Sequence, residues 1–208
     1  MGDFRSHILG RLLSRSERDG FSPDEIDRLH IKGDRLYRLK VLRINYTSYD
    51  LRRDSDSINS TSRPDVILLS GDSGDSGDSD SHPYTYARVI GVFHSDIAYA
   101  TQGTPESDIK YERMDIIWAR FFRLCPGYSF GFSERKLPRL EFLHHTEAGA
   151  FGFLDPEIII RSVHLIPAFN YGKTSEFLPK SIVRPLPKKS SRGNGEDDED
   201  YWYYYVNM

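Results

Sequence analysis

The sequence has very little cysteine and no long apolar run. Cys125 is the single cysteine among 208 residues, which excludes an intramolecular disulfide and argues against a cysteine-based zinc site. No stretch approaches the roughly 18 apolar residues of a membrane span. The first residues, MGDFRSHILGRLL, lack the apolar segment of a secretory signal. These absences predict an intracellular protein, nuclear or cytoplasmic, without a membrane partner.

Aromatic residues are abundant, with 13 Tyr and 12 Phe. Both favour strands and large-area contacts, so the composition favours β structure and a recognition role. The net charge of −3 hides a division, because residues 70–81 carry four Asp and residues 194–208 carry five acids. Residues 82–193 hold 15 basic and 11 acidic side chains. The foldable part is therefore mildly basic, which permits an anionic partner without requiring one.

The N-terminal third predicts short helices followed by a hairpin. Residues 4–15 place Phe4, Ile8, Leu9 and Leu12 on one helical face. Ser22-Pro23-Asp24-Glu25 has the pattern of a capping box at a helix start. The turn residues Lys32-Gly33-Asp34 then predict a hairpin with strands near 28–32 and 35–49. A loop is expected over 52–64 and a buried strand over 65–69.

The second half predicts several short strands separated by turns. Expected strands cover residues 83–100 (two short strands or one bent strand, with Gly91 allowing a bulge), 115–124, 140–145, 147–155 and 158–169, and the last residues, YWYYYVNM, are strongly β-forming. This pattern predicts a mainly β fold with short helices: a small, partly open β-barrel plus an N-terminal helix and hairpin.

Four segments follow from the same pattern and from the composition. They are an N-terminal helical and hairpin segment at 1–69, a flexible Ser/Gly/Asp linker at 70–81, a β-barrel-like domain at 82–186, and an acidic linker with a β-prone, truncated tail at 187–208.

Candidate catalytic motifs are incomplete. Gly172-Lys173-Thr174 lacks the glycine that a phosphate-binding loop needs five residues earlier, where Pro167 stands. His144 and His145 are adjacent, and neighbouring side chains of a strand point to opposite faces, so they do not readily share one metal ion. We therefore predict no catalytic residues, no metal site and no cofactor, and we identify no small-molecule substrate.

Aromatic and basic residues alternate in two of the predicted strands. Tyr84, Tyr86 and Arg88 share one face of the first, and Trp118 and Arg120 share one face of a strand expected to pair with it. Rings beside guanidinium groups suit stacking and cation–π contacts. These five residues are the predicted binding groove. The alternative is that the rings belong to the core and the arginines are solvated.

Several segments together resemble a known family. The runs INYTSYDLRRDSDSIN, HPYTYARVIGVFH, RMDIIWARFF, AFGFLDPEIIIRSVHLIPAF and YWYYYVNM are similar to transposon-derived proteins of mushroom-forming fungi, related to CACTA (En/Spm-like) elements. The resemblance covers residue 22 to the end. Members of that family usually continue beyond the YVNM run, which implies that this chain is either a fragment or a truncated copy. The family supplies no catalytic residue to transfer.

A second, weaker resemblance is to bromo-adjacent homology domains, which are small barrels that recognise chromatin proteins. Ala87-Arg88-Val89, Ala119-Arg120-Phe121-Phe122 and Pro156-Glu157-Ile158-Ile159 follow the order of their strand motifs. The expected function is a non-catalytic recognition module for a protein or chromatin partner. The alternative is a nucleic-acid-binding accessory of a DNA transposon, and a more distant one is the remnant of a transposase enzyme.

Overall fold

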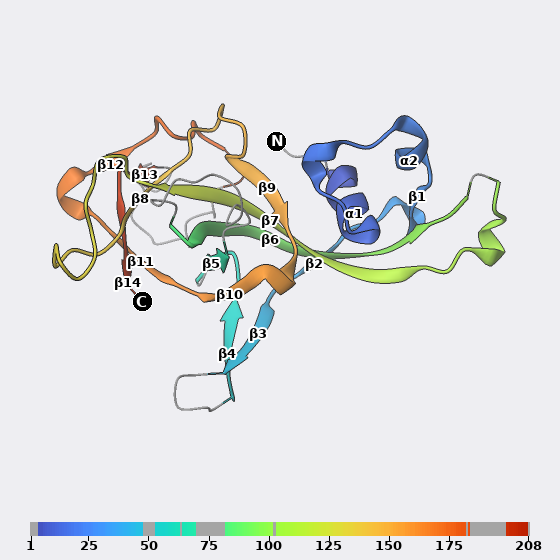
Figure 1. Ribbon diagram of the computed structural model, residues 1–208, viewed down its shortest axis with the longest axis horizontal. Coiled ribbons are helices and arrows are strands. Elements are labelled where there is room, and N and C mark those ends of the chain that lie inside the picture. The colour runs from blue at the N-terminus through green and yellow to red at the C-terminus, as the bar shows by residue number, and fades with distance from the viewer. Residues whose placement is uncertain are drawn as a thin grey trace, which may run out of the picture.

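The computed structural model describes residues 4–47, 53–62, 64–69, 82–101, 103–181, 183 and 199–207. Within them the fold is mainly β, with two short α-helices, α1 (Phe4–Leu13) and α2 (Pro23–Asp27), at one end of the molecule (Figure 1). The segment 70–81 and most of 187–200, which the sequence predicts to be linkers, lie outside the described residues.

Ten strands form one sheet in the order β10-β5-β6-β7-β8-β14-β11, with β1 and β2 added beside β6 and β9 added beside β7. In chain order these strands are β1 (Leu29–Ile31), β2 (Tyr37–Leu39), β5 (Asp65–Leu69), β6 (Tyr84–Tyr99), β7 (Glu112–Leu124), β8 (Arg139–Phe142), β9 (Phe151–Leu154), β10 (Ile159–Ser162), β11 (His164–Pro167) and β14 (Tyr204–Asn207). Two separate pairs are β3 (Leu42–Thr47) with β4 (Arg53–Ile58), and β12 (Lys173–Thr174) with β13 (Asp200–Tyr201).

The described strand order is open, which differs from a closed barrel. Its two end strands, β10 and β11, are nevertheless consecutive in the chain and separated only by Val163. The sequence predicted one strand over 158–169, and the structure divides it at that residue. β10 pairs with β5, whereas β11 pairs with β14. One segment thus supplies both ends of the sheet.

The long antiparallel pair of β6 and β7 is the centre of the sheet. Its register shifts between Val89 and Gly91, as the predicted bulge requires. A Cβ at Gly91 would lie 2.6 Å from the Phe93 ring, so this position has no room for a side chain unless that ring moves. The predicted strands over 83–100 and 115–124 are confirmed.

The two faces of this pair bury different clusters. One cluster includes Tyr86, Phe122, Phe142 and Tyr204, and the other includes Ala87, Val89, Ile117 and Ala119. Successive strand residues point to opposite faces, so both sides of β6 and β7 are covered by other elements. A third cluster docks α1 at the far end of the pair through Ile8 and Leu9, both fully buried.

The N-terminal helices follow the sequence prediction, but the hairpin after them does not. The Ser22 hydroxyl accepts from the Glu25 backbone N–H, and the Glu25 side chain accepts from the Ser22 backbone, which completes the capping box. β1 and β2, however, do not pair with each other. Both pair with β6 along the same edge, because the turn at Gly33 (φ +61°) returns the chain to its original direction.

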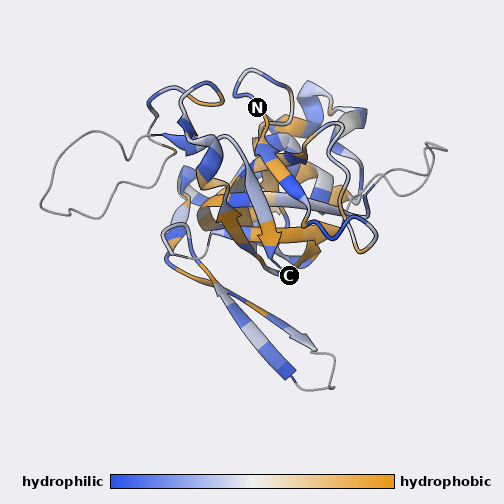
Figure 2. Cartoon of the chain, turned by 90° about the vertical axis from the view of Figure 1, so that its left-hand side faces the viewer, coloured by the Kyte–Doolittle hydropathy of each residue, from blue (hydrophilic) through white to orange (hydrophobic). Residues whose placement is uncertain are grey.

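The predicted loop over 52–64 is also corrected. Residues Arg53–Ile58 form β4, which pairs with β3 in a hairpin that projects from the body of the molecule (Figures 1 and 2). Asp56 anchors this hairpin: its carboxylate is buried and accepts from the Ser162 backbone N–H at 2.9 Å. A polar sequence therefore forms a strand because its one buried carboxylate has a partner on β10.

The predicted division of the chain into a 1–69 segment and an 82–186 domain does not correspond to a division of the sheet. β1, β2 and β5 precede residue 70, yet all three pair with β6. β14 belongs to the predicted tail, yet it lies between β8 and β11. Residues from three of the predicted segments thus build one sheet.

Candidate recognition surface

The five residues of the predicted groove lie on β6 and β7, which pair as expected. Arg88 is opposite Arg120, and Tyr86 is opposite Phe122. The face that they share is an interior one: Tyr86 is 2% exposed and Arg120 is 4% exposed. These two residues therefore form part of the core, which corrects the prediction of an open groove. The reason is that β8 and β14 cover this face with Phe142 and Tyr204.

Each of these two arginines, Arg120 buried and Arg88 half-buried, has its own aspartate. Arg88 donates to Asp65 of β5 through two nitrogens, Nε–Oδ1 at 2.7 Å and Nη2–Oδ2 at 3.1 Å. Arg120 donates through Nη1 to Asp200 Oδ2 at 2.8 Å. Asp200 lies 80 residues further along the chain, so sequence spacing could not indicate this partner.

Aromatic rings surround the same guanidinium groups. The Arg120 guanidinium lies 3.7 Å from the centre of the Phe142 ring, and the Arg88 guanidinium lies 5.0 Å from that of Tyr204. Burial alone would lower the pKa of Arg88, but the charge of Asp65 and hydrogen bonds to Asp65 and Tyr204 raise it above its ordinary value. The interleaving of rings and cations in β6 and β7 is thus an internal network.

Tyr84 and Trp118 are half-buried. Trp118 is opposite Phe153 of β9, and its Nε1 has no hydrogen-bond partner within the described residues. Tyr84 lines a cavity of about 320 Å³ at the break between β10 and β11. An adjoining cavity of about 550 Å³ is lined by Arg88 and Asp65, and the two share Ser162, Val163 and His164.

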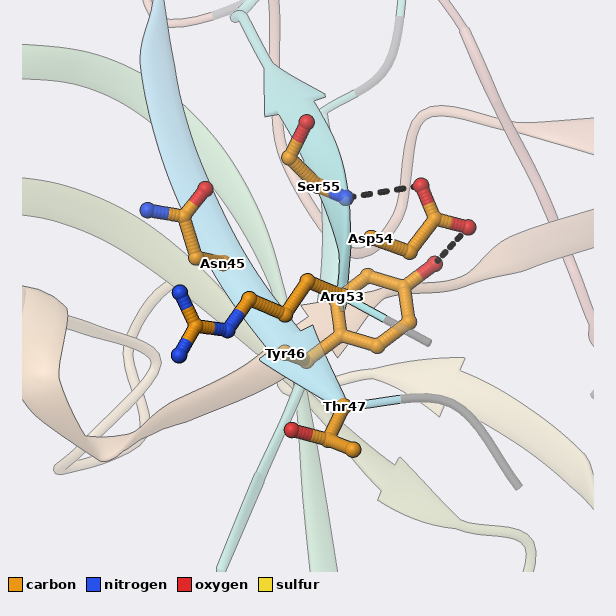
Figure 3. A pocket seen from close by; sticks show the side chains of 6 residues that line it. All are labelled: Asn45, Tyr46, Thr47, Arg53, Asp54 and Ser55. Atoms are coloured by element: carbon orange, nitrogen blue, oxygen red, sulfur yellow. Dashed lines mark hydrogen bonds between the residues drawn. The ribbon is translucent and has the colours of Figure 1, made fainter. Parts of the chain in front are cut away.

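A further cavity of about 550 Å³ lies on the β3–β4 hairpin (Figure 3). Its lining is polar and largely exposed. The Tyr46 hydroxyl donates to Asp54 at 3.4 Å, and the Ser55 backbone N–H donates to the same carboxylate at 2.7 Å. The Tyr46–Asp54 contact joins the two strands, whereas the Ser55 contact lies within β4. Among the described residues, the lining contains neither a nucleophile beside a base nor a group of metal ligands.

An outward cluster of rings lies on the other side of β8 and β14. Tyr203 and Tyr205 alternate with the buried Tyr204 and Val206 along the C-terminal run, so they point away from the core. Tyr205 is opposite Arg139 of β8. Figure 2 views the molecule from the side of these strands. We define the tyrosine–arginine surface as Arg139 together with Tyr128, Tyr171, Tyr203 and Tyr205.

Arg139 is the centre of this surface. Its guanidinium lies 4.1 Å from the ring centre of Tyr128, 4.4 Å from that of Tyr203 and 5.6 Å from that of Tyr171. It donates to the Tyr171 hydroxyl at 3.3 Å and also hydrogen-bonds Tyr205. The rings come from three separate segments: the loop after β7, the 3-10 turn Phe169–Tyr171, and the C-terminal run.

The surface remains accessible. Tyr171 is 49% exposed and its neighbour Phe169 is 67% exposed, whereas the other rings and Arg139 are half-buried. Lys136 lies 5.8 Å from the Tyr128 ring centre, and Lys173 lies at the same distance from that of Tyr201. Lys136 therefore places a second cation beside a ring of the defined surface.

Reactive side chains elsewhere are Cys125 and the two histidines that follow β8. Burial raises the pKa of the Cys125 thiol to about 11, so the thiol is protonated at neutral pH and is a weak nucleophile. The rings of His144 and His145 lie together, 4.4 Å apart, rather than on opposite faces, because they follow the end of β8. In the part of the chain that the structure describes, no three His, Cys, Asp or Glu side chains gather as a metal ion would require.

Neither described helix is long and apolar enough to cross a membrane. Comparison of the chain with models of protein families, with curated proteins and with solved structures finds no match. The argument for function therefore rests on the geometry of the chain itself.

The sequence did contain a signal for the tyrosine–arginine surface. That signal was the β-forming, tyrosine-rich run at the C-terminal end; its division into two core residues and two outward rings over Tyr203–Val206 is seen only in the structure. The contribution of Arg139 was not visible, because it depends on the pairing of β8 with β14 across more than 60 residues.

Proposed function

We propose that the chain is a non-catalytic recognition module that binds a protein partner, in chromatin or elsewhere, through the tyrosine–arginine surface. The observation that carries this proposal is Arg139 held among four tyrosines on an outward face. Tyr and Arg are the residue types that most often dominate protein interfaces, because they combine large contact area with directed polar groups. Contacts among the rings also fix them before binding, which reduces the entropic cost of association.

A chromatin role and an origin in a DNA transposon belong to the same proposal. They are supported by the motifs that resemble the fungal transposon-derived family. A fold similar to the small barrel of bromo-adjacent homology domains is supported by the positions of the three matching motifs in the sheet. Ala87–Val89 is in β6, Ala119–Phe122 is in the neighbouring β7, and Pro156–Ile159 leads into β10. This likeness concerns fold, and fold alone does not fix function.

A second candidate is binding of nucleic acid, as an accessory of a transposon. It is favoured by the basic excess between residues 82 and 193 and by the lysines beside the rings. The two candidates differ in their response to salt. Binding dominated by phosphate contacts weakens steeply as salt rises, because it depends on counterion release. Binding dominated by ring and hydrogen-bond contacts weakens less.

The test is direct binding of the purified chain to a peptide panel that includes histone peptides, and to DNA and RNA, at low and high salt. We expect at least one peptide to bind, with a smaller loss of affinity at high salt than counterion release gives for nucleic acid. Binding confined to nucleic acid, with a steep loss at high salt, would favour the second candidate. Absence of binding to every peptide would contradict the first.

The surface is tested with Tyr171→Ala, which removes an exposed ring. We expect roughly tenfold weaker peptide binding, within the range of truncated interface rings. Tyr99→Ala is the matched control, because Tyr99 is also an exposed tyrosine but lies at the far end of β6. Equal effects of the two substitutions would place the binding site elsewhere.

A further inference from the structure

The geometry points to an acidic peptide segment as the partner of the tyrosine–arginine surface, bound through carboxylates that approach Arg139. This inference rests on the proposed function, because it names the chemistry of the protein partner. It goes beyond that function in excluding cationic segments, such as unmodified or methylated lysine tails, as ligands of this surface.

Within the described residues, Arg139 differs from the other arginines of the central strands because no carboxylate forms an ion pair with it. Arg88 pairs with Asp65, Arg120 with Asp200, and Arg123 with both Glu141 and Glu147. No described carboxylate forms an ion pair with Arg139. Its contacts are ring faces, phenol hydroxyls and the Cys125 thiol. A half-buried cation without a counter-charge gains from an incoming carboxylate, since charge-assisted hydrogen bonds are the strong ones.

The groups around Arg139 also favour a ligand of negative charge. Lys136 lies 5.8 Å from the ring centre of Tyr128, and tyrosine hydroxyls add neutral donors. The carboxylate of Glu134 is 3.8 Å from Lys136, so it offsets part of that one charge. The exposed Phe169 adds an apolar contact for a peptide side chain. The surface is thus complementary to a segment of negative charge that also carries an apolar residue.

A cationic ligand does not fit, because the chain's own cation occupies the rings. The Arg139 guanidinium lies within 4.4 Å of the ring centres of Tyr128 and Tyr203. A lysine or methyl-lysine head group would have to displace it and would also meet the repulsion of the nearby Lys136. A cluster of aromatic rings can bind an incoming cation only when no other cation already lies against the rings.

The position of Arg139 against the tyrosine rings also favours a peptide over nucleic acid as the ligand. Stacking of bases needs free, flat ring faces. Here Tyr128 and Tyr203 each have a face covered by Arg139, and Tyr171 meets Tyr203 edge to face with ring centres 5.0 Å apart. The faces that Arg139 covers are therefore not available for stacking, whereas its guanidinium and the tyrosine hydroxyls can meet the carboxylates of an extended peptide.

The experiment measures fluorescence anisotropy of labelled probes with the full chain. The probes are a short Glu-rich peptide containing one Phe, the same peptide with Gln for Glu, the same with Lys for Glu, and a single-stranded oligothymidine of equal charge. We expect the Glu peptide to bind at least tenfold more tightly than the other three. Tighter binding of the oligothymidine would replace the inference by nucleic-acid recognition.

Substitutions then connect the preference to Arg139. Arg139→Gln should weaken binding of the Glu peptide about tenfold, as expected for one charged hydrogen bond, and leave the Gln peptide unchanged. Arg161→Gln is the matched control, because Arg161 also lies over a tyrosine ring, at 5.2 Å, but on β10. If Arg139→Gln fails to fold by circular dichroism, Lys136→Gln, at an exposed position, replaces it with an expected smaller loss in the same direction.

The outcomes separate the two proposals. If the Glu, Gln and Lys peptides bind equally and Tyr171→Ala weakens all of them, the surface recognises proteins but the acidic preference is wrong. If no peptide binds, or if Tyr171→Ala changes nothing, the recognition surface itself is wrong. An unchanged affinity of Arg139→Gln for the Glu peptide would overturn the role of Arg139 alone.

Discussion

Two arginines lie opposite each other on β6 and β7 inside the sheet. Their positive charges would repel each other if no negative charge neutralised them. Arg88 and Arg120 are each neutralised by an aspartate from another part of the chain, Asp65 and Asp200. The side chains of Arg120 and Asp200 are 5% and 8% exposed. A buried pair of this kind costs desolvation when it forms, yet removal of one partner leaves an unpaired buried charge. The arginines therefore make the fold depend on two distant acids.

The first prediction concerns Asp200. Asp200→Ala removes the carboxylate that accepts from Arg120 Nη1 in a buried site, so we expect the free energy of unfolding to fall by about 3–5 kcal/mol. Urea denaturation followed by circular dichroism measures the loss. Glu199→Ala is the matched control, because Glu199 is an adjacent acid but exposed, and its loss should stay within about 0.5 kcal/mol. Equal losses would show that the pair does not stabilise the fold.

The second prediction concerns the reactivity of Cys125. Burial raises the pKa of its thiol from 9.0 to about 11, which lowers the thiolate population at pH 8 roughly a hundredfold. We expect iodoacetamide to alkylate the native chain at least that much more slowly than the chain unfolded in urea. Because the pKa is higher in the folded state, this contribution to stability is complete below pH 9 and is lost as the pH rises toward 11. Equal alkylation rates would contradict the burial of the thiol.

At the scale of elements, the sequence predicts those that depend on local patterns. The capping box at Ser22, the amphipathic α1 and the bulge at Gly91 were all visible, because neighbouring residues determine them. The pairing of β1 and β2 with β6 was not, because a turn signal at Gly33 fits both a hairpin and a return to the same edge. The strand Arg53–Ile58 was missed because its buried acid, Asp56, has its partners on β10.

The same distinction applies to the candidate site. The sequence shows that rings and cations alternate in β6 and β7, but it does not show whether the face that they share is exposed. Its exposure depends on which other elements pack against it. Phe142 and Tyr204 cover Arg120 and Tyr86, so the alternation marks a core network. The outward rings of the C-terminal run become a surface only once β14 pairs with β8 and brings Arg139 beside them. A site built across strands is thus set by register, which composition does not contain.

The third prediction concerns the docking of α1. His7 lies on this helix and is buried, with Nδ1 2.6 Å from Glu17 Oε1. Burial lowers its pKa below 6.5, against the opposing hydrogen bond and charge of Glu17, and Arg11 and Asp155 also face it with opposite effects. The folded state therefore favours neutral His7, and this stability is present above pH 6.5 and is lost as the pH falls below it.

His7→Gln keeps a neutral hydrogen-bonding side chain but removes the titration. We expect the wild-type chain to lose more stability than His7→Gln when urea denaturation is repeated at pH 7.5 and pH 5. Groups elsewhere titrate equally in both chains, so the difference reports His7 alone. The same loss in both chains would show that the docking of α1 does not depend on this protonation.

At the scale of the whole molecule, the sheet joins parts of the chain that composition separates. β5 precedes the acidic residues 70–81 and β6 follows them, yet the two strands pair over five residues, from Asp65 opposite Arg88 to Leu69 opposite Tyr84. β1 and β2 pair with β6 as well. Val66, Ile67 and Leu68 are buried. The first 69 residues therefore supply one side of the core that the later strands require.

The last prediction follows from this arrangement. A protease site inserted within residues 70–81 and then cleaved should leave the two pieces associated, because strand pairing, buried side chains and the Arg88–Asp65 ion pair hold them together. We expect one peak in size-exclusion chromatography and an unchanged circular dichroism spectrum, with separation only in denaturant. The piece from residue 82 onward, expressed alone, should aggregate, because the edge of β6 and the apolar side chains that β5 covers would be exposed. Pieces that separate in native buffer while each keeps its β signal would instead show that the chain consists of two independent domains divided at residues 70–81.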